Sequence, residues 1–180
     1  MATGTESNYF GNKNIEAYSL PMKTISDALT LRNTILTRLD RATRLTSEVE
    51  RQKMLTFVIA GAGPTGVELS GVLAEMNTSI LKKDYPELGD KDIVKIYLVD
   101  GMPTVLNVMS KKSQDYTYKK LKQLGVEIKL NCLVKDFNKD IVELSDGSKI
   151  ESRNLIWAAG VSAKTFEGFE KSSYGKGKRL

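Results

Sequence analysis

Residues 55–73 of the chain read LTFVIAGAGPTGVELSGVL. The apolar run 57–60 is short and rich in β-branched residues, as is typical of a buried parallel strand. The glycine pattern GAGPTG follows at 61–66 and leads directly into apolar positions at helical spacing. A strand, a Gly-x-Gly-x-x-Gly turn and a helix in this order predict a dinucleotide-binding Rossmann unit. The alternative is a glycine-rich strand-to-helix turn in another doubly wound fold.

Each glycine of the turn has a separate mechanical role in such a unit. Gly61 makes the tight turn, Gly63 lets the backbone approach a pyrophosphate, and Gly66 allows helix and strand to pack closely. Pro64 suits the first helical turn, because its missing N–H would have no intrahelical partner. With Thr65 it begins a helix whose free N–H groups and partial positive charge favour a phosphate. The pattern therefore predicts that this loop holds the phosphates of a nucleotide.

Composition limits the chemistry that the chain can perform. Its 180 residues fit one domain of ordinary size, with 41% hydrophobic residues and a formal net charge of +5. Histidine is absent and Cys132 is the single cysteine, which excludes an internal disulfide and the commonest acid–base catalyst. We therefore expect no metal site, and chemistry must come from a bound cofactor or from carboxylates.

The chain carries no sign of a nucleic-acid or membrane partner. Part of the positive charge lies in the last ten residues, and no RNA- or DNA-binding motif accompanies it. No apolar run approaches the roughly 18 residues that span a membrane, and no secretory leader is visible. We expect a soluble, cytoplasmic segment without membrane contact of its own.

The remaining pattern alternates helices and strands. It predicts helices over 24–42, 47–54, 64–82 and 110–124, and strands over 93–99, 126–130, 133–137, 141–144, 149–150 and 155–157. The fold class expected is α/β, a Rossmann-like parallel sheet with helices on both faces and an antiparallel β-meander. Residues 1–23 show little periodicity and are predicted to be extended or irregular, and the tail after Gly168 is predicted to be loose. Because the carboxyl ends of parallel strands share one edge, the glycine loop, Asp100 and the turn Ala158-Ala159-Gly160 are expected to meet there.

Asp100 follows the second strand, where an acidic side chain accepts hydrogen bonds from an adenosine ribose. It lies 34 residues beyond Gly66 (100 − 66), whereas the acidic residue of a dinucleotide-binding motif usually follows about 20 residues after the glycines. The long helix and the charged loop between Gly66 and Asp100 explain the greater separation. No Lys or Arg occurs between Asp100 and Lys111 to neutralise a 2′-phosphate, which favours NAD(H) over NADP(H). The alternative for Asp100 is an ordinary turn residue at a strand end.

Three further residues are open to two interpretations. Glu68 near the start of the helix could face the nicotinamide end of the cleft, or could simply stabilise the helix dipole. Trp157 is more typical of a core residue than of a cofactor platform. Cys132 lies in a strand pattern and is expected to be buried and inert.

Three segments together resemble the type II NADH dehydrogenase family of NADH:quinone oxidoreductases. They are YSLPMKTISDALTLRN at 18–33, FVIAGAGPTGVELSGVLAEM at 57–76 and NLIWAAGV at 154–161. The resemblance implies that Gly61, Gly63, Gly66 and Asp100 hold NADH and that Ala158–Gly160 line the cleft. It also implies that Glu68 matches a family glutamate near the point where nicotinamide and flavin meet.

The resemblance further implies that this chain is one domain of a longer enzyme. In that family an NADH-binding unit is inserted into an FAD-binding domain, and Ala2-Thr3-Gly4 resembles the point where the chain leaves that domain. Residues 1–23 would then lead in from the FAD domain, 24–168 would form the NADH-binding domain, and 169–180 would lead back. The expected reaction is hydride transfer from NADH to FAD and then reduction of a quinone. FAD would not be bound by this chain, and the whole protein would be a peripheral enzyme on the cytoplasmic face of the membrane.

The sequence is also compatible with three alternatives. The chain could be the NAD domain of another two-domain flavoprotein reductase, such as a disulfide or ferredoxin reductase. It could also be a freestanding NADH-sensing module without catalysis, or a purely structural Rossmann-like domain.

Overall fold

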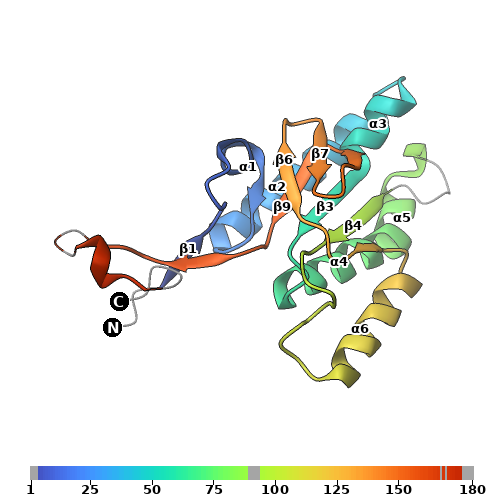
Figure 1. Ribbon diagram of the computed structural model, residues 1–180. Coiled ribbons are helices and arrows are strands. Elements are labelled where there is room, and N and C mark those ends of the chain that lie inside the picture. The colour runs from blue at the N-terminus through green and yellow to red at the C-terminus, as the bar shows by residue number, and fades with distance from the viewer. Residues whose placement is uncertain (1–3, 89–93, 167, 169, 176–180) are drawn as a thin grey trace.

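The computed structural model describes residues 4–88, 94–166, 168 and 170–175, and Figure 1 shows their arrangement. At its centre lies a parallel sheet of five strands in the order β2-β9-β3-β4-β5. These strands are β2 (Leu20–Pro21), β9 (Asn154–Trp157), β3 (Thr56–Ala60), β4 (Lys95–Val99) and β5 (Glu127–Lys129). The predicted α/β class with a Rossmann-like parallel sheet is confirmed.

One face of the sheet is covered by helices. Successive side chains of a strand point to opposite sides, and Phe57 and Ile59 of β3 both pack into this helical layer. Leu39, Leu73 and Leu121 face them from three different helices and are buried in the same cluster. These leucines belong to α2 (Ile25–Thr43), α4 (Pro64–Met76) and α6 (Lys111–Gln123). A further helix, α3 (Glu48–Leu55), leads into β3.

The opposite face is covered by the antiparallel meander and one short helix. Val58, Ala60 and Trp157 point to this side and share a buried cluster with residues of all three meander strands. The meander strands are β6 (Val134–Phe137), β7 (Ile141–Leu144) and β8 (Lys149–Glu151). Helix α1 (Lys13–Tyr18) joins the layer through the buried Ile15. Helices therefore lie on both faces, and the predicted meander is confirmed.

The prediction that residues 1–23 are extended or irregular is wrong for residues 13–18, which form helix α1, whereas β2 is an extended segment. Ile15 is only 2% exposed, and the Asn12 side chain both caps α1 and donates from Nδ2 to the Lys135 carbonyl oxygen at 2.9 Å. A helix of six residues is too short to show a periodic pattern, and distant contacts stabilise it. Residues 1–3, which include Ala2-Thr3, lie outside the described part of the chain.

The helix expected over residues 64–82 is a regular α-helix only as far as Met76. After Met76 the chain forms a π-helix, Asn77–Leu81, followed by α5 (Lys82–Asp84) and the 3-10 turn Pro86–Leu88. Asn77 is buried, and its side chain exchanges two hydrogen bonds with the backbone of Val94 just before β4. The π-helix thus begins at the residue whose side chain is hydrogen-bonded to the segment before β4.

Two segments from opposite ends of the described chain pair with each other. The strand β1 (Thr5–Ser7) runs antiparallel to β10 (Val161–Ala163), with Thr5 opposite Ala163. In Figure 1 this pair extends away from the central sheet. The tail after Gly168 was expected to be loose, and residues 171–173 form a single 3-10 turn.

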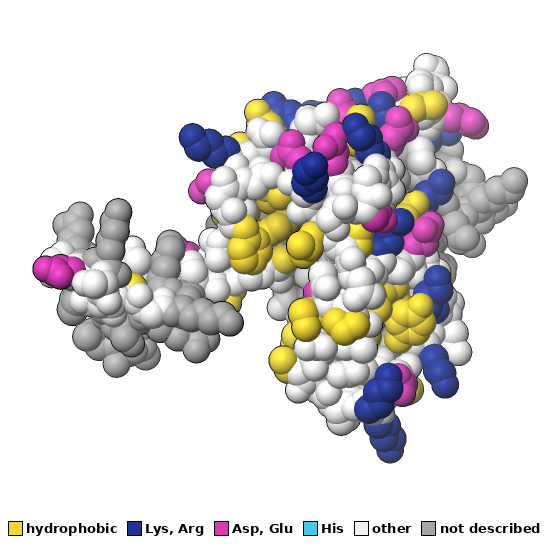
Figure 2. Space-filling model, in the orientation of Figure 1, with side chains coloured by type: hydrophobic (Ala, Val, Ile, Leu, Met, Phe, Trp, Pro, Cys, Tyr) yellow, Lys and Arg dark blue, Asp and Glu magenta, His cyan; other side chains and the backbone are white. Residues whose placement is uncertain are grey.

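Helix α6 is rich in positive charge. The helix carries five lysines and one aspartate, Asp115, and Figure 2 shows basic side chains spread over it. Lys111 pairs with Asp115 at 2.9 Å across one helical turn, with both side chains largely exposed. Such exposed pairs contribute little to stability, so this surface is a solvated helix face.

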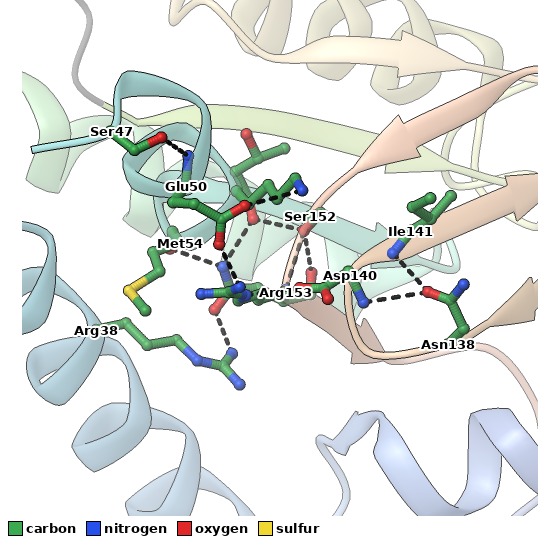
Figure 3. Close-up of polar contacts among 12 residues, drawn as sticks. Arg38, Ser47, Glu50, Met54, Asn138, Asp140, Ile141, Ser152 and Arg153 are labelled. Atoms are coloured by element: carbon green, nitrogen blue, oxygen red, sulfur yellow. Dashed lines mark hydrogen bonds and ion pairs between the residues drawn. The ribbon is translucent and has the colours of Figure 1, made fainter. Parts of the chain in front are cut away.

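A polar cluster closes the amino-terminal edge of the sheet, and Figure 3 shows its members. Arg153 donates to Asp140 at 2.6 Å and to Glu50 at 2.5 Å, which links the meander to α3. Arg38 of α2 donates to the buried side chain of Asn154. The Asn154 amide in turn donates to the backbone oxygens of Met54 and Thr56. The cluster fixes the helices at the end of the sheet away from the glycine loop.

We expect this cluster to make the stability of the domain depend on pH in the acid range. The Arg153 hydrogen bond lowers the pKa of Asp140, and the Lys53 hydrogen bond together with the Arg153 charge lowers the pKa of Glu50. A carboxylate whose pKa is lower in the folded state stabilises the fold above its unfolded pKa of about 4, and that stabilisation is lost as the pH falls through the folded pKa. We expect Arg153→Gln to make the fall in melting temperature between about pH 5 and pH 3 shallower.

The matched control for this prediction is Arg44→Gln. Arg44 also pairs with a carboxylate, Asp40, but both side chains are more than half exposed. Melting curves at half-unit pH steps should therefore show an unchanged acid slope in this control. An Arg153→Gln slope identical to that of the unmodified chain would contradict the prediction.

Candidate functional site

The carboxyl ends of β3, β4 and β9 meet at one edge of the sheet, as predicted from the strand order. A cavity of about 480 Å³ opens there. Its lining includes six of the residues that the sequence singled out: Gly61, Gly63, Asp100, Ala158, Ala159 and Gly160. The fold therefore brings three separate segments of the chain to one place.

The three glycines of the loop differ in the space around them. A Cβ on Gly61 would lie 2.7 Å from the Ala158 carbonyl oxygen, and its φ of +105° favours glycine as well. A Cβ on Gly66 would lie 1.8 Å from the Gly61 carbonyl oxygen, because α4 starts directly against the loop. A Cβ on Gly63 would meet no atom within 4 Å. Gly61 and Gly66 are thus explained by packing within the protein, whereas Gly63 faces open space.

The start of α4 differs from that of the other long helices. Side chains of Thr24, Ser47 and Ser110 cap α2, α3 and α6 by accepting backbone N–H bonds. Helix α4 starts at Gly63 with no side-chain cap and with proline in its first turn. The first N–H groups of a helix need partners from outside it, and an anion can supply them. Uncapped N–H groups beside an open Gly63 are therefore suited to a phosphate.

Asp100 holds the glycine loop in place. One carboxylate oxygen accepts the Ala62 N–H at 2.5 Å, and the other accepts the Met102 N–H at 2.7 Å. A carboxylate has about four lone-pair sites, so two remain for hydroxyl groups of a ligand. The sequence predicted the ribose contact but not the bond to Ala62, which joins residues 38 positions apart.

The other predicted site residues lie outside the cavity lining. Pro64 and Thr65 are exposed in the first turn of α4, and Gly66 is buried beneath them. Glu68 is exposed on α4, about one turn further along, and does not belong to the lining. Its role near a nicotinamide stays a prediction.

Several lining residues were not predicted from the sequence. Phe10, Met102 and Leu133 contribute exposed apolar side chains to the cavity wall. Trp157 and Cys132 are buried, as expected, and also reach the cavity. Only the tertiary structure places these residues beside the glycine loop, since no local motif marks them.

Neither a membrane span nor a metal centre is found in the described residues. No helix among them combines the length and apolarity needed to cross a bilayer. In the same part of the chain, His, Cys, Asp and Glu side chains do not gather in a group of three or more that could hold a metal ion.

A parallel sheet with an uncapped helix after a glycine loop defines a nucleotide-binding domain of the Rossmann type. The chain belongs to the pyridine nucleotide-disulphide oxidoreductase family, which matches it over residues 1–176. Within the family it resembles the type II NADH:quinone oxidoreductases, as the motifs predicted. It is 40% identical over 167 residues to the type II NADH:quinone oxidoreductase Ndh of Mycobacterium tuberculosis. The matched region covers 91% of this chain and 36% of Ndh.

Two further comparisons agree with this assignment. The chain is 30% identical to the external alternative NAD(P)H-ubiquinone oxidoreductase B2 of Arabidopsis thaliana mitochondria, covering 91% of the chain and 29% of that protein. The structure of NDH2 from Plasmodium falciparum in complex with NADH superimposes with a TM-score of 0.83 at 26% identity, over 89% of this chain and 34% of that one. The chain therefore spans about a third of the length of these relatives.

Proposed function

We propose that this chain is the NADH-binding domain of a type II NADH:quinone oxidoreductase. In that enzyme it would hold NADH while a hydride passes to FAD, and electrons would then pass to a quinone. The observation that carries the proposal is the uncapped start of α4 at the open Gly63, beside Asp100, in one cavity. The similarity to NADH:quinone oxidoreductases and to NDH2 in complex with NADH supports the choice of NADH and quinone as reactants.

Each part of the site has a role toward NADH in this proposal. The N–H groups at the start of α4 bind the pyrophosphate, with Gly61, Gly63, Pro64, Thr65 and Gly66 shaping the loop. Asp100 accepts hydrogen bonds from the adenosine ribose. A negative carboxylate at that position also disfavours a 2′-phosphate, which makes NADPH the poorer ligand.

The nicotinamide half of NADH extends in the opposite direction in this proposal. Strand β9 lies on the other side of β3 from β4. The nicotinamide half therefore passes the turn Ala158–Gly160 at the end of β9. Glu68 is the candidate for orienting the reacting end from α4. The domain itself supplies binding and orientation, and the bound cofactors supply the redox chemistry.

The longer enzyme would provide what this domain does not. We assign residues 1–23 and 169–180 to the connections with an FAD-binding domain, and residues 24–168 to the NADH-binding domain. Quinones are apolar and dissolve in bilayers, so the whole enzyme would work at a membrane surface. We place it on the cytoplasmic face and assign the membrane contact to parts outside this domain.

Gly63→Ala tests the phosphate site directly. The backbone of Gly63 has φ −74° and ψ −176°, which alanine adopts readily, and the new methyl group would meet no protein atom. The melting temperature should stay within a few degrees. NADH binding, measured by calorimetry, should weaken roughly tenfold or more, because the methyl group stands where the pyrophosphate approaches.

The matched control is Gly71→Ala in the middle of α4. A Cβ on Gly71 also meets nothing within 4 Å, and alanine is the better helix former by about 1 kcal/mol. This variant should be slightly more stable and bind NADH unchanged. If Gly63→Ala instead binds NADH normally, the phosphate does not lie over this loop and the proposed site is wrong.

Flavin content and turnover test whether this chain binds NADH without binding FAD or catalysing the reaction by itself. The sequence holds one glycine-rich nucleotide motif, and the proposal uses it for NADH. The purified chain should therefore be colourless, and it should not oxidise NADH in the presence of a quinone. Absorbance near the flavin band and the rate of NADH consumption measure both properties. Stoichiometric flavin in the preparation, or steady turnover, would show that the chain is an enzyme by itself.

A further inference from the structure

The conformation of Phe10 is unusual for an aromatic residue. It lies in the turn formed by residues 9–12, closed by the Asn12 N–H donating to the Tyr9 carbonyl oxygen at 3.0 Å. Phe10 and Gly11, the two central residues of this turn, have positive φ angles of 53° and 79°. Turns of this type favour glycine, asparagine or aspartate at both central positions. The backbone therefore gives no reason for a phenylalanine here.

Burial gives no reason either. The Phe10 side chain is 70% exposed, although large apolar side chains are usually buried. Its ring makes an edge contact with the Trp157 ring, with centroids 6.3 Å apart. The remaining surface of the ring faces solvent and the cavity, whose wall Phe10 helps to form. A bulky ring in a glycine-like turn is thus left uncovered at the mouth of the candidate site.

Hydrogen bonds around Asn8 restrain the backbone that carries this ring and the Trp157 ring that it contacts. The Asn8 side-chain oxygen accepts the Phe10 N–H at 2.9 Å, and the Asn8 carbonyl oxygen accepts the Trp157 indole N–H at 3.0 Å. A Cβ on Gly160 would lie only 2.7 Å from the tip of the Phe10 ring. Gly160, whose φ of +81° favours glycine as well, therefore leaves free the space that the ring occupies.

The strand order indicates which half of a dinucleotide would meet this ring. Strand β3 lies between β4 and β9, so the glycine loop separates Asp100 from the turn after β9. With the adenosine ribose at Asp100 and the pyrophosphate at the loop, the nicotinamide half extends toward Gly160 and Phe10. We propose that Phe10 is a cofactor-binding residue whose ring packs against the nicotinamide ring of NADH. This inference rests on the proposed function and adds a specific contact to it.

Phe10→Asn separates binding from folding. Asparagine is favoured in this type of turn, so the variant should melt at or above the temperature of the unmodified chain. Loss of an aromatic contact should weaken NADH binding about three- to tenfold, measured by calorimetry on the 180-residue chain. ADP-ribose, which lacks the nicotinamide, should bind the variant and the unmodified chain equally. Phe10→Tyr, which keeps the ring, should retain NADH affinity.

Tyr116→Asn provides the control for removal of an exposed aromatic side chain. Tyr116 is 71% exposed on α6 and lies outside the cavity lining, so NADH affinity should not change. If Phe10→Asn binds NADH as tightly as the unmodified chain, the inference is wrong while the proposed function stands. Equal losses for NADH and ADP-ribose would also overturn it, since the ring would then not be specific to the nicotinamide half. If the unmodified chain binds neither ligand, the proposed function fails and the inference fails with it.

Discussion

Gly66→Ala is expected to destabilise the domain by about 3 kcal/mol or more, the upper range for overpacking a filled site. A methyl group on Gly66 would lie 1.8 Å from the Gly61 carbonyl oxygen and 3.0 Å from its carbon. Both atoms belong to the backbone, so relief requires the loop or the whole of α4 to shift. Some nucleotide-binding loops carry alanine at the corresponding glycine, but this chain leaves no room for it.

Thermal unfolding followed by circular dichroism measures this effect. For a chain of this size, about 3 kcal/mol corresponds to a fall of roughly 6–12 °C in melting temperature. NADH binding should fall as well, because the loop that moves is the phosphate site. Gly71→Ala, a substitution on the same helix without a clash, should raise the melting temperature slightly. A Gly66→Ala variant as stable as the unmodified chain would show that helix and loop are not in close contact.

Asp100→Ala is expected to weaken NADH binding about 10- to 150-fold, since hydrogen bonds to a charged group contribute roughly 1.5–3 kcal/mol. Part of this loss would arise indirectly, because Asp100 also holds the Ala62 N–H of the glycine loop. Comparing NADH with NADPH separates the two effects. A disturbed loop weakens both cofactors alike, whereas loss of the ribose contact removes the preference for NADH.

The unmodified chain should therefore bind NADH more tightly than NADPH, and Asp100→Ala should bind the two with similar affinity. Asp115→Ala, which removes an exposed carboxylate on α6, should alter neither affinity. Calorimetric titration of both cofactors against the three proteins measures all six values. Equal affinities of the unmodified chain for NADH and NADPH would rule out a ribose contact by Asp100.

Short-range patterns predicted the central elements well. The helices predicted over 24–42 and 110–124 are present, with a Thr24–Asp27 capping box at the start of α2 and Ser110 capping the start of α6. The strand, glycine loop and helix at 55–73 have the predicted form. Each of these features depends on residues within a few positions of one another, so a single stretch of sequence contains all the information.

Other features depend on residues far apart in the sequence. The Arg153–Glu50 ion pair joins residues 103 positions apart, and the Trp157–Asn8 hydrogen bond joins residues 149 positions apart. Helix α1 was missed because its stability comes from contacts of this kind. The same holds for Phe10 at the cavity, which no local motif marks.

From sequence alone, the fold class, the glycine loop and the family of this protein could be inferred. The fold class and the glycine loop follow from hydrophobic periodicity, capping and turn chemistry, which act between neighbouring residues. The family follows from the resemblance of three sequence segments to the type II NADH dehydrogenases. The tertiary structure alone decided that Asp100 holds the loop, that Gly63 faces open space and that Phe10 meets Gly160. These contacts exist only after the sheet has brought separate strand ends to one edge, and no local preference encodes the distances between them.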